Sequence, residues 1–508
     1  MGELTERAQA EVWVGLDLGT SGAKGIALGT DGTIVARAAA DYPTQRPAPH
    51  ASEQDPALWL HACTDVVARL RAVVEPAGWR GIALSAMIPT LVVLDERMRP
   101  LAPAVTWEDA RAERHGERLR TAIGADWLYE RTGQWVDGRY LLAMYERLAH
   151  DQPAVAARAR HLVGAKDLLF AWLTGELLTD PSTAAGYGAY DVRADAWLAE
   201  PQDALEAELG APVPQLPPVA PSHSTRPLSA TAALILGLPA GLPICLGAAD
   251  SVLGALGLGV DAPGDVAYIA GTSTVVLAIA DGWNPDPRHR YLLTPLAGSP
   301  ALGLEMDLLA TGSAIRWLAT LLADSGGEAD LLALASELAP ADAPAFLPYL
   351  APGEQGALWN ADLYGTVAGL HLGHGAAHLA RGLLNGIMLE SRRCLGVLAD
   401  VGLPPGEIRA GGWCAAAPGV CRDLADCCRR SVRTTATETR DCSALGAARL
   451  LARALGDQIA EPGSAAGCAV APDEKRARDW DALWERHEAL RQATTPVYEQ
   501  QEALCTGQ

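Results

Sequence analysis

Two apolar runs near the N-terminus predict a β-hairpin with a polar turn. Residues 12–18 form the first run, and residues 22–28 form the second after a Gly-rich turn. A third run, residues 34–42, follows a Thr-Asp-Gly turn. Apolar runs joined by short Gly-rich turns are typical of antiparallel strands, whereas a Rossmann unit would place its glycines at the start of a helix. The chain is therefore predicted to open with a β-hairpin followed by a third strand.

Helical patterns alternate with further strands through the rest of the first half. Residues 56–74 have apolar positions at helical spacing after the polar cap Ser-Glu-Gln-Asp, which predicts an amphipathic helix. Residues 81–95 indicate a strand, a loop and a second strand, and residues 108–169 are charged and helical. Because residues 201–246 are rich in proline, we interpret part of this stretch as a surface connection that approaches a domain boundary.

The second half repeats this order of elements. Residues 242–251 predict a strand that leads into a loop, and residues 265–282 predict a second β-hairpin. Long helices are predicted over residues 376–398 and 443–455. The tail, residues 469–508, is predicted to form a charged helix packed on the surface of the second domain.

Each hairpin carries the same triplet in its turn. Gly-Thr-Ser occupies residues 19–21 in the first hairpin and residues 271–273 in the second, and an apolar strand and an Asp-Gly turn follow each triplet. The two Asp-Gly turns are two residues out of phase, so the repeat is approximate. Duplication of an ancestral domain and chance repetition of a common turn both explain it.

Charge and cysteine usage narrow the classes of partner and location. The chain has 508 residues with 40 basic and 61 acidic side chains, for a net charge of −21, and such a field repels nucleic acid and anionic membranes. The 10 cysteines contain no CxxC pair, so free thiols are favoured over a zinc site or disulfides. No apolar run reaches the roughly 18 residues of a membrane helix. A cytoplasmic location without nucleic-acid or membrane partners is predicted.

The Gly-Thr-Ser turns suit phosphate chemistry. Successive backbone N–H groups and two hydroxyls at one turn make a cradle for phosphate oxygens, although neither turn fits the P-loop pattern. Asp17 stands two residues before Gly19, where a carboxylate is useful as an Mg²⁺ anchor. Plain structural turns, with Asp17 capping a loop, remain the alternative.

Three further motifs could carry chemistry. Asp250 follows a strand in a small-sided loop and is either a general base or a helix cap. Residues 106–111, Thr-Trp-Glu-Asp-Ala-Arg, place a Trp beside two carboxylates, as in sugar sites, or mark a solvated helix start. Gly411 and Gly412 would let the backbone approach a flat ring such as adenine.

These motifs, in this order, resemble the FGGY carbohydrate kinases from about Val12 to Leu455. The specific segments are DLGTSGAK, SEQDPALW, TWEDAR, the lysine-led KDLLFAWLTGELLTDPSTAAGYGAYDV, GAADS, AGTSTVVLA, LATGSAIRWL, GTVAGLHLGHGAAHLARGLLNGIMLE and RAGGWCAAAPGVCRDLAD. The resemblance implies an α/β fold of two actin-like ATPase (ribonuclease H-like) domains, related by duplication, with a nucleotide and sugar cleft between them. The expected division is residues 1–246 and residues 247–508.

The resemblance also implies a role for each candidate residue. The expected activity is phosphate transfer from ATP, with Mg²⁺, to a hydroxyl of a small carbohydrate, with Asp250 as general base and Asp17 as metal anchor. A homodimer is what the family suggests. The remaining expected contacts are Thr20, Ser21 and Lys24 on the phosphate path; Gly271, Thr272 and Ser273 on the terminal phosphates; Gly312 on the nucleotide; Gly411 and Gly412 on adenine; and Trp107, Glu108 and Asp109 on the sugar.

Departures from the xylulokinase pattern concern the sugar side. Residues 85–90, Ser-Ala-Met-Ile-Pro-Thr, stand where xylulokinases usually carry Gln-Met-His-Gly, and Glu108 replaces the usual Asn, exchanging an amide for an acceptor-only carboxylate. The usual Gly-Glu-Arg is Gly-Glu-Gln at residues 353–355. A pentulose such as xylulose, a related polyol or an aldonate is the expected substrate. The alternative is an actin-like ATPase that acts as a chaperone or activator.

Overall fold

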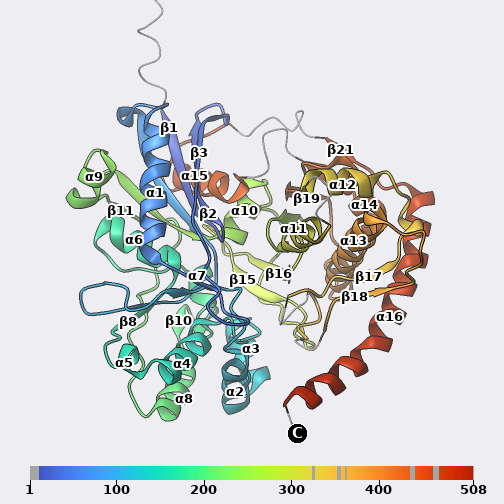
Figure 1. Ribbon diagram of the computed structural model, residues 1–508. Coiled ribbons are helices and arrows are strands. Elements are labelled where there is room, and N and C mark those ends of the chain that lie inside the picture. The colour runs from blue at the N-terminus through green and yellow to red at the C-terminus, as the bar shows by residue number, and fades with distance from the viewer. Residues whose placement is uncertain are drawn as a thin grey trace, which may run out of the picture. The chain divides into compact units, whose positions relative to one another are not determined.

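The structure is a computed structural model that describes residues 11–322, 327–351, 356–360, 363–434, 441–460 and 468–506. It divides into two compact units (Figure 1). Unit 1 comprises residues 1–259, 281–303 and 441–465, and unit 2 comprises residues 260–280, 304–440 and 466–508. The division predicted after residue 246 falls inside strand β12, Pro243–Ala249, whose residues all belong to unit 1.

Unit 1 is built on a six-stranded sheet in the order β11-β12-β5-β1-β2-β3. Strands β1, β5 and β12 are parallel, and β2, β3 and β11 run antiparallel to their neighbours. The strands of unit 1 are β1 Val12–Leu18, β2 Gly22–Gly29, β3 Ile34–Asp41, β4 Glu53–Gln54, β5 Trp79–Ala86, β6 Val92–Leu94, β7 Ala104–Val105, β8 His161–Val163, β9 Tyr190–Asp191, β10 Ala196–Trp197, β11 Thr225–Pro227, β12 Pro243–Ala249 and β15 Leu292–Pro295.

The helices of unit 1 cover both faces of this sheet and form a helical group below it in Figure 1. They are α1 Pro56–Arg71, α2 Glu113–Ile123, α3 Ala125–Thr132, α4 Leu141–Asp151, α5 Pro153–Ala156, α6 Ala165–Thr174, α7 Pro181–Ala185, α8 Ala199–Leu209, α9 Ala230–Leu236, α10 Asp250–Gly257 and α15 Cys442–Leu455. The charged segment predicted as helical is thus a series of short helices. Their apolar sides share a core separate from that of the sheet.

Strand β1 is buried on both faces because alternate residues point to different helices. Val14 and Leu16 belong to the core that includes α1 and α6, whereas Trp13 belongs to the core that includes α10 and α15. At Gly15 a Cβ atom would lie 1.8 Å from the backbone oxygen of Ala444. Only glycine therefore lets α15 lie this close to β1.

Helices α10 and α15 contact each other through glycines in the same way. A Cβ atom on Gly257 would lie 1.9 Å from the oxygen of Cys442, and one on Gly446 would lie 1.8 Å from the oxygen of Leu253. Backbones pack directly where no side chain intervenes. Helix α10, which begins at Asp250, is therefore held by close backbone contact along its length.

Unit 2 contains a sheet with the strand order β16-β14-β13-β19-β20-β21. Strands β13, β19 and β20 are parallel, and β14 forms a hairpin with β13. The elements are β13 Val266–Ala270, β14 Thr274–Ala280, β16 Leu302–Leu308, α11 Gly312–Leu321, α12 Glu328–Ser336, β17 Ala345–Leu347, β18 Thr366–Ala368, α13 Ala376–Asp400, β19 Ile408–Gly412, α14 Pro418–Cys428, β20 Val432–Thr434, β21 Ala469–Val470 and α16 Glu474–Thr506.

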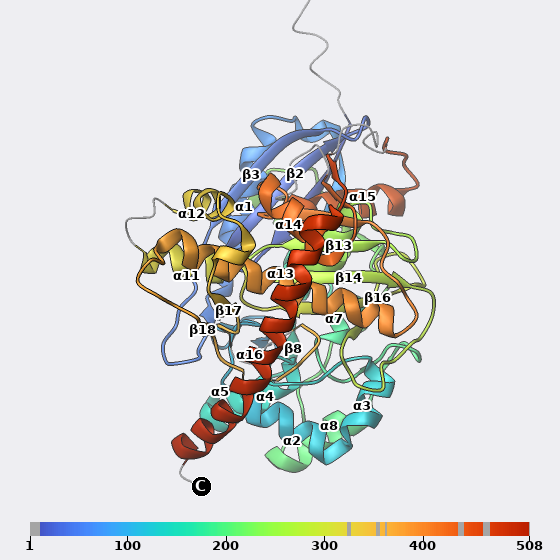
Figure 2. The same cartoon turned by 90° about the vertical axis from the view of Figure 1, so that its right-hand side faces the viewer.

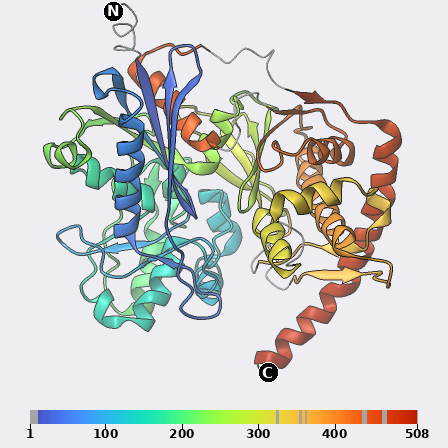
Figure 3. The same cartoon turned by 45° about the horizontal axis from the view of Figure 1, so that its top comes forward.

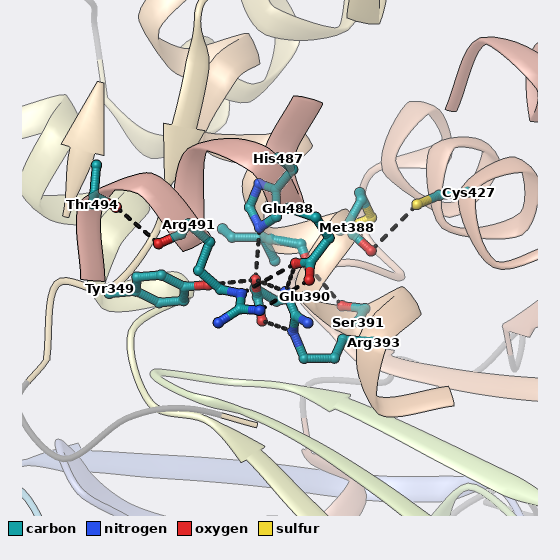
Figure 4. Close-up of polar contacts among 11 residues, drawn as sticks. Tyr349, Met388, Glu390, Ser391, Arg393, Cys427, His487, Glu488, Arg491 and Thr494 are labelled. Atoms are coloured by element: carbon teal, nitrogen blue, oxygen red, sulfur yellow. Dashed lines mark hydrogen bonds and ion pairs between the residues drawn. The ribbon is translucent and has the colours of Figure 1, made fainter. Parts of the chain in front are cut away.

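The C-terminal helix α16 packs on the surface of unit 2, against α13, α14 and β17, as predicted (Figures 2 and 3). A buried polar cluster joins it to α13 (Figure 4). The Glu390 carboxylate accepts from Tyr349 Oη at 2.8 Å and from Arg393 Nε at 2.9 Å, and His487 Nε2 lies 2.7 Å from it. Burial alone would raise the pKa of Glu390, but Arg393 and His487 together lower it.

Most predicted elements are present, but some differ in extent. The small-sided loop predicted to carry Asp250 is absent, because β12 continues to Ala249 and α10 begins at Asp250. Helix α1 ends at Arg71 rather than Val74. The connection predicted within residues 201–246, residues 211–227, lies between α8 and α9 and contains only the short strand β11, whereas the flanking residues of the stretch belong to α8, α9 and β12. Proline-rich composition indicated the loops of this stretch but not the short elements between them.

Two expectations about the whole chain can be compared with the described residues. None of the helices there is both long and apolar enough to span a bilayer. Nine of the cysteines in the described part of the chain are not in disulfides, and seven of these nine are buried. Burial raises the pKa of the Cys63 and Cys245 thiols to about 12, so these two cysteines are protonated packing residues rather than reactive groups.

Candidate active site

The first Gly-Thr-Ser turn follows the carboxyl end of β1 and is held by three side chains. The Trp107 indole donates to Thr20 Oγ1 at 3.0 Å, and the Gln54 amide donates to the Thr20 carbonyl at 2.7 Å. The Tyr42 hydroxyl donates to the Gly19 carbonyl. Ser21 at the end of the turn is exposed. These three hydrogen bonds fix the backbone of the turn, while the exposed Ser21 remains accessible to solvent.

Asp17 lies beside this turn, nearly buried, between two polar neighbours. In the sheet it pairs with Lys24 on β2 and with Ser85 on β5, and Ser85 Oγ donates to Asp17 Oδ1 at 2.6 Å. Burial raises the pKa of Asp17, and Lys24 and Ser85 oppose that rise. Among the described residues, none makes a hydrogen bond to Oδ2. One carboxylate oxygen is therefore oriented by Ser85 while the other can accept a cation.

The segment predicted to contact sugar, residues 106–111, lies beside the first turn, because its Trp107 donates to Thr20. Glu108 is half-buried, and its Oε2 pairs with the exposed Arg46 at 2.9 Å. Asp109 is 1% exposed, and its oxygens accept from Arg111 and, at 2.8 Å, from the Ser52 backbone N–H. Helix α2 begins only at Glu113, so this block is not a solvated helix start. Within it, Trp107 and Glu108 retain exposed surface, whereas Asp109 organises its neighbours.

Asp250 is the first residue of α10, directly after β12. Its side chain is half-buried, and Oδ1 accepts from the Ser251 backbone N–H at 2.9 Å. The preceding Ala249 N–H donates to Ser182 Oγ at 2.9 Å, and Ser443 Oγ donates to the Asp250 carbonyl at 2.9 Å. The backbone that carries this carboxylate is therefore fixed from two other elements, α7 and α15.

The candidate residues of unit 1 meet at one edge of its sheet. Asp17 is near the end of β1, Ser85 is near the end of β5, and Asp250 follows the end of β12. These three strands are parallel neighbours, so their carboxyl ends share one edge. Ligands of α/β proteins bind outside the carboxyl ends of parallel strands. The fold thus gathers residues that are far apart in the sequence at the expected place.

The second Gly-Thr-Ser turn occupies the matching place in unit 2, after β13. The Gly271 N–H donates to the Ser273 carbonyl at 2.8 Å, and the Ser313 N–H in α11 donates to the Thr272 carbonyl at 3.0 Å. A Cβ atom on Gly312 would lie 2.2 Å from the Gly271 oxygen. The start of α11 therefore lies against this turn only because residue 312 is glycine.

The Gly-Gly-Trp segment lies at the end of β19, next to β13. Gly411 pairs with Ile269, and Gly412 pairs with Ala270 in the register of the two parallel strands. Gly412 has a φ of 75°, and a Cβ atom there would lie 1.8 Å from the Ala270 oxygen. The Trp413 indole nitrogen is buried and has no hydrogen-bond partner in the described part of the chain. An unused donor beside small residues is a feature that a bound nucleotide could satisfy.

Two other groups of residues do not contribute to the candidate active site as described. Residues 353–355, where an Arg is replaced by Gln, lie outside the described residues. His115, Glu146 and His150 are close enough to share a metal ion. Arg118 Nε, however, donates to Glu146 Oε1 at 2.7 Å and Nη2 to the other oxygen. We therefore interpret this group as an ion-pair network.

Two α/β units that each present a polar turn at the carboxyl edge of parallel strands are the arrangement expected of a nucleotide-dependent phosphotransferase. Comparison with known families agrees. Residues 12–257 match the N-terminal domain of the FGGY family of carbohydrate kinases, and residues 266–455 match its C-terminal domain. The chain belongs to the FGGY family of carbohydrate kinases.

Individual relatives include kinases for several sugars. The gluconokinase of Bacillus subtilis (strain 168) is 26% identical over 401 residues, 74% of each chain. The xylulose kinase of Klebsiella pneumoniae is 30% identical over 380 residues, 74% of this chain and 76% of the relative. The xylulose kinase structure from Rhodospirillum rubrum, 30% identical, matches with a TM-score of 0.83 over 96% of this chain and 100% of the other.

Family membership establishes the coarse activity. The protein is a carbohydrate kinase, a phosphotransferase that uses ATP and an alcohol group as acceptor. The predicted two-domain α/β fold of this family is confirmed, because a gluconate kinase structure from Lactobacillus acidophilus, 25% identical, matches with a TM-score of 0.85 over 97% of the chain. The alternative of an ATPase that activates a partner is therefore not retained.

Proposed function

We propose that the protein transfers the γ-phosphate of ATP to a hydroxyl of a small carbohydrate, a pentulose such as xylulose or a related polyol or aldonate. The observation that carries this proposal is the shared position of the two Gly-Thr-Ser turns, with two carboxylates, Asp17 and Asp250, at the sheet edge of unit 1. The names of the relatives, gluconokinase, xylulose kinase and glycerol kinase, support this range of substrates.

The nucleotide is assigned to the residues of unit 2. The backbone N–H groups of residues 271–273 would hold the terminal phosphates, and Gly411 and Gly412 would flank adenine. Gly312 and Gly412 let α11 and the end of β19 pack directly against the backbone of Gly271 and Ala270, so these glycines hold the second turn and the Gly-Gly-Trp segment together. The Trp413 indole would donate to the nucleotide. In unit 1, Thr20, Ser21 and Lys24 would line the path of the transferred phosphate.

Asp17 is proposed to hold Mg²⁺, directly or through water. Its Oδ2 fits this role because Oδ1 is already oriented by Ser85 and a carboxylate oxygen is a ligand that Mg²⁺ prefers. When bound, the metal neutralises charge that develops on the phosphate oxygens. The nearby Lys24 would stabilise the same charge without a metal bond.

Asp250 is proposed to act as the general base. A carboxylate at this position can accept the proton of the sugar hydroxyl as that oxygen attacks the γ-phosphorus in line with the leaving group. Backbone N–H groups of the turns stabilise the charge on the phosphoryl oxygens during transfer. The fixed start of α10 supports this role, because a base must be held within hydrogen-bond reach of the proton it removes.

Trp107, Glu108 and Asp109 are proposed to form the sugar side. Trp107 offers an aromatic face, and Glu108 offers an acceptor for hydroxyls, while Asp109 with Arg111 fixes the segment that carries them. The departures from the xylulokinase pattern at residues 85–90 and at Glu108 favour a substrate other than xylulose. A homodimeric assembly, a cytoplasmic location and the division of roles between residues 1–246 and 247–508 stay predictions.

A substrate panel tests this proposal. The purified protein with Mg-ATP is assayed against ketopentoses, polyols and aldonates, and both ADP release and the phosphorylated sugar are measured. We expect sugar-dependent ADP release with at least one member and an equal amount of phosphorylated product. ADP release no faster with any sugar than without sugar would refute the proposed substrate range.

A further inference from the structure

Unit 1 contains a fully buried lysine that is connected, through a series of hydrogen bonds, to the backbone before Asp250, the candidate base. The side chain of Lys166, at the start of α6, is 0% exposed, and its Nζ lies 3.1 Å from Asp180 Oδ1 and 3.4 Å from Asp167 Oδ1. Both aspartates are buried as well. Burying charged groups is costly even when they are paired. The proposed phosphate transfer assigns no role to Lys166, Asp167 or Asp180. Their contacts show which part of the fold they hold in place.

Asp180 connects this group to the backbone that carries Asp250. Its Oδ2 accepts from the Ser182 N–H at 3.0 Å and from Ser182 Oγ at 2.5 Å. The hydroxyl proton of Ser182 is thereby committed to Asp180, which leaves the Ser182 oxygen to accept from Ala249 N–H at 2.9 Å. Because Asp250 follows Ala249 directly, each bond in this series constrains the start of α10.

We propose that Ser182, oriented by the Lys166–Asp180 ion pair, is a positioning residue for Asp250. The inference rests on the proposed role of Asp250 as general base. Lys166 compensates the charge of Asp180, Asp180 fixes the rotation of the Ser182 hydroxyl, and Ser182 fixes the amide of Ala249. The ion pair thereby controls where the Asp250 carboxylate lies, although Lys166, Asp180 and Ser182 are themselves buried.

Thr183 provides a comparison, because its hydroxyl also donates to Asp180, although to Oδ1 rather than to the Oδ2 that Ser182 contacts. Thr183 Oγ1 donates to Asp180 Oδ1 at 2.6 Å, so it stabilises the same carboxylate from the same helix. Within the described residues, Thr183 makes no hydrogen bond to the segment before α10. If Asp180 serves only to cap α7, loss of either hydroxyl should have similar consequences. If the series of bonds positions Asp250, loss of the Ser182 hydroxyl alone should affect phosphate transfer.

The test compares S182A, T183V and S182T in the full-length protein. We expect S182A to lower kcat for sugar phosphorylation about tenfold, with the KM for ATP within about twofold of wild type. T183V should keep kcat within about twofold of wild type, and S182T should recover most of the lost rate. Hydrogen exchange at the Ala249 amide should speed up about tenfold in S182A but not in T183V, a change that does not depend on activity.

A second variant tests the contribution of the ion pair. D180N should lower kcat in the same way as S182A, and adding S182A to D180N should lower kcat little further, because both changes break one series of bonds. Equal loss of kcat in S182A and T183V, or unchanged exchange at Ala249 in S182A, would overturn the inference.

The D250A variant separates this inference from the proposed function. If D250A abolishes turnover while S182A and T183V behave alike, only the positioning role fails. If D250A retains turnover, the general base has been misassigned, and the positioning role fails with it.

Discussion

The two Gly-Thr-Ser turns share a sequence and a place at the carboxyl edge of parallel strands, but they are supported differently. The first turn is held by side chains, with Trp107 on the Thr20 hydroxyl and Gln54 on the Thr20 carbonyl. The second is held by the start of α11, which lies against it through Gly312 and donates to the Thr272 carbonyl from both the N–H and the hydroxyl of Ser313. A shared triplet therefore fixes the turn but not its surroundings, and the surroundings determine what each turn can bind.

A tryptophan lies beside each turn, and the state of its indole N–H differs. Trp107 donates to Thr20, so its N–H is used within the protein. Trp413 lies against Gly312, and its N–H has no partner among the residues described. Because buried donors almost always have a hydrogen-bond partner, we infer that Trp107 stabilises its turn and that the Trp413 N–H donates to a bound ligand.

The two turns also differ in the residue that stands two positions before the glycine of each triplet. Asp17 stands there in the first hairpin, oriented by Ser85, and Ile269 stands there in the second. A carboxylate can hold a cation, and an isoleucine cannot. The first turn is therefore suited to metal and phosphate, and the second to phosphate alone.

The largest expected effect tests this difference in charge. D17N should lower kcat by about 10²–10³-fold, because an amide holds Mg²⁺ far less well and the metal contributes several kcal/mol to charge stabilisation. I269N, the same amide at the matching position, should change kcat much less. Steady-state kinetics over a range of Mg²⁺ concentrations measure both. Equal losses in the two variants would contradict the proposed asymmetry.

The next effect concerns how closely backbone approaches each turn. G312A would place Cβ 2.2 Å from the Gly271 oxygen, whereas on Gly19 the nearest atom would be 3.5 Å away, an ordinary contact. We expect G312A to lower the free energy of unfolding by about 1–3 kcal/mol and to raise the KM for ATP. G19A should leave stability nearly unchanged. Thermal unfolding and ATP titration of G312A and G19A test this contrast. A G312A variant with wild-type stability and a wild-type KM for ATP would contradict it.

The smallest expected effect comes from the two tryptophans. W413F keeps an aromatic ring but removes the donor, so the Kd for ATP should rise about threefold to tenfold, the value of one hydrogen bond. W107F should leave the Kd for ATP unchanged and raise the KM for sugar, because the N–H bond to Thr20 orients the Trp107 ring on the proposed sugar side. Calorimetric titration with ATP distinguishes them. An unaltered Kd in W413F would mean that the indole N–H does not meet the nucleotide.

Local sequence signals were sufficient for the elements that carry the site. The hairpins could be predicted because apolar runs flank polar, Gly-rich turns. Helix α1 could be predicted because Asp55, which accepts from the Ala57 N–H, is a residue type that caps helices. Asp17 and Asp250 could be chosen because each lies at the end of an apolar strand or directly after one, and the structure places both at one edge of the sheet.

The partners of these residues could not be predicted from local patterns. Ser85 is 68 positions from Asp17, and Ser182 is 67 positions from Ala249, so only the fold brings them together. Asp109 was expected to face sugar with its neighbours, but Arg111 and the Ser52 backbone already occupy its oxygens. A sequence pattern shows that an acceptor is present and does not show which donor uses it.

The most direct test of the account is phosphate transfer by D250N. The variant keeps the size and helix position of the side chain but cannot accept a proton. With a sugar that the wild type phosphorylates, we predict that kcat falls by about 10²–10⁴-fold while the Kd for ATP, measured by calorimetry, stays within about twofold. A D250N protein that transfers phosphate to sugar at close to the wild-type rate would contradict the assignment of Asp250 as the general base.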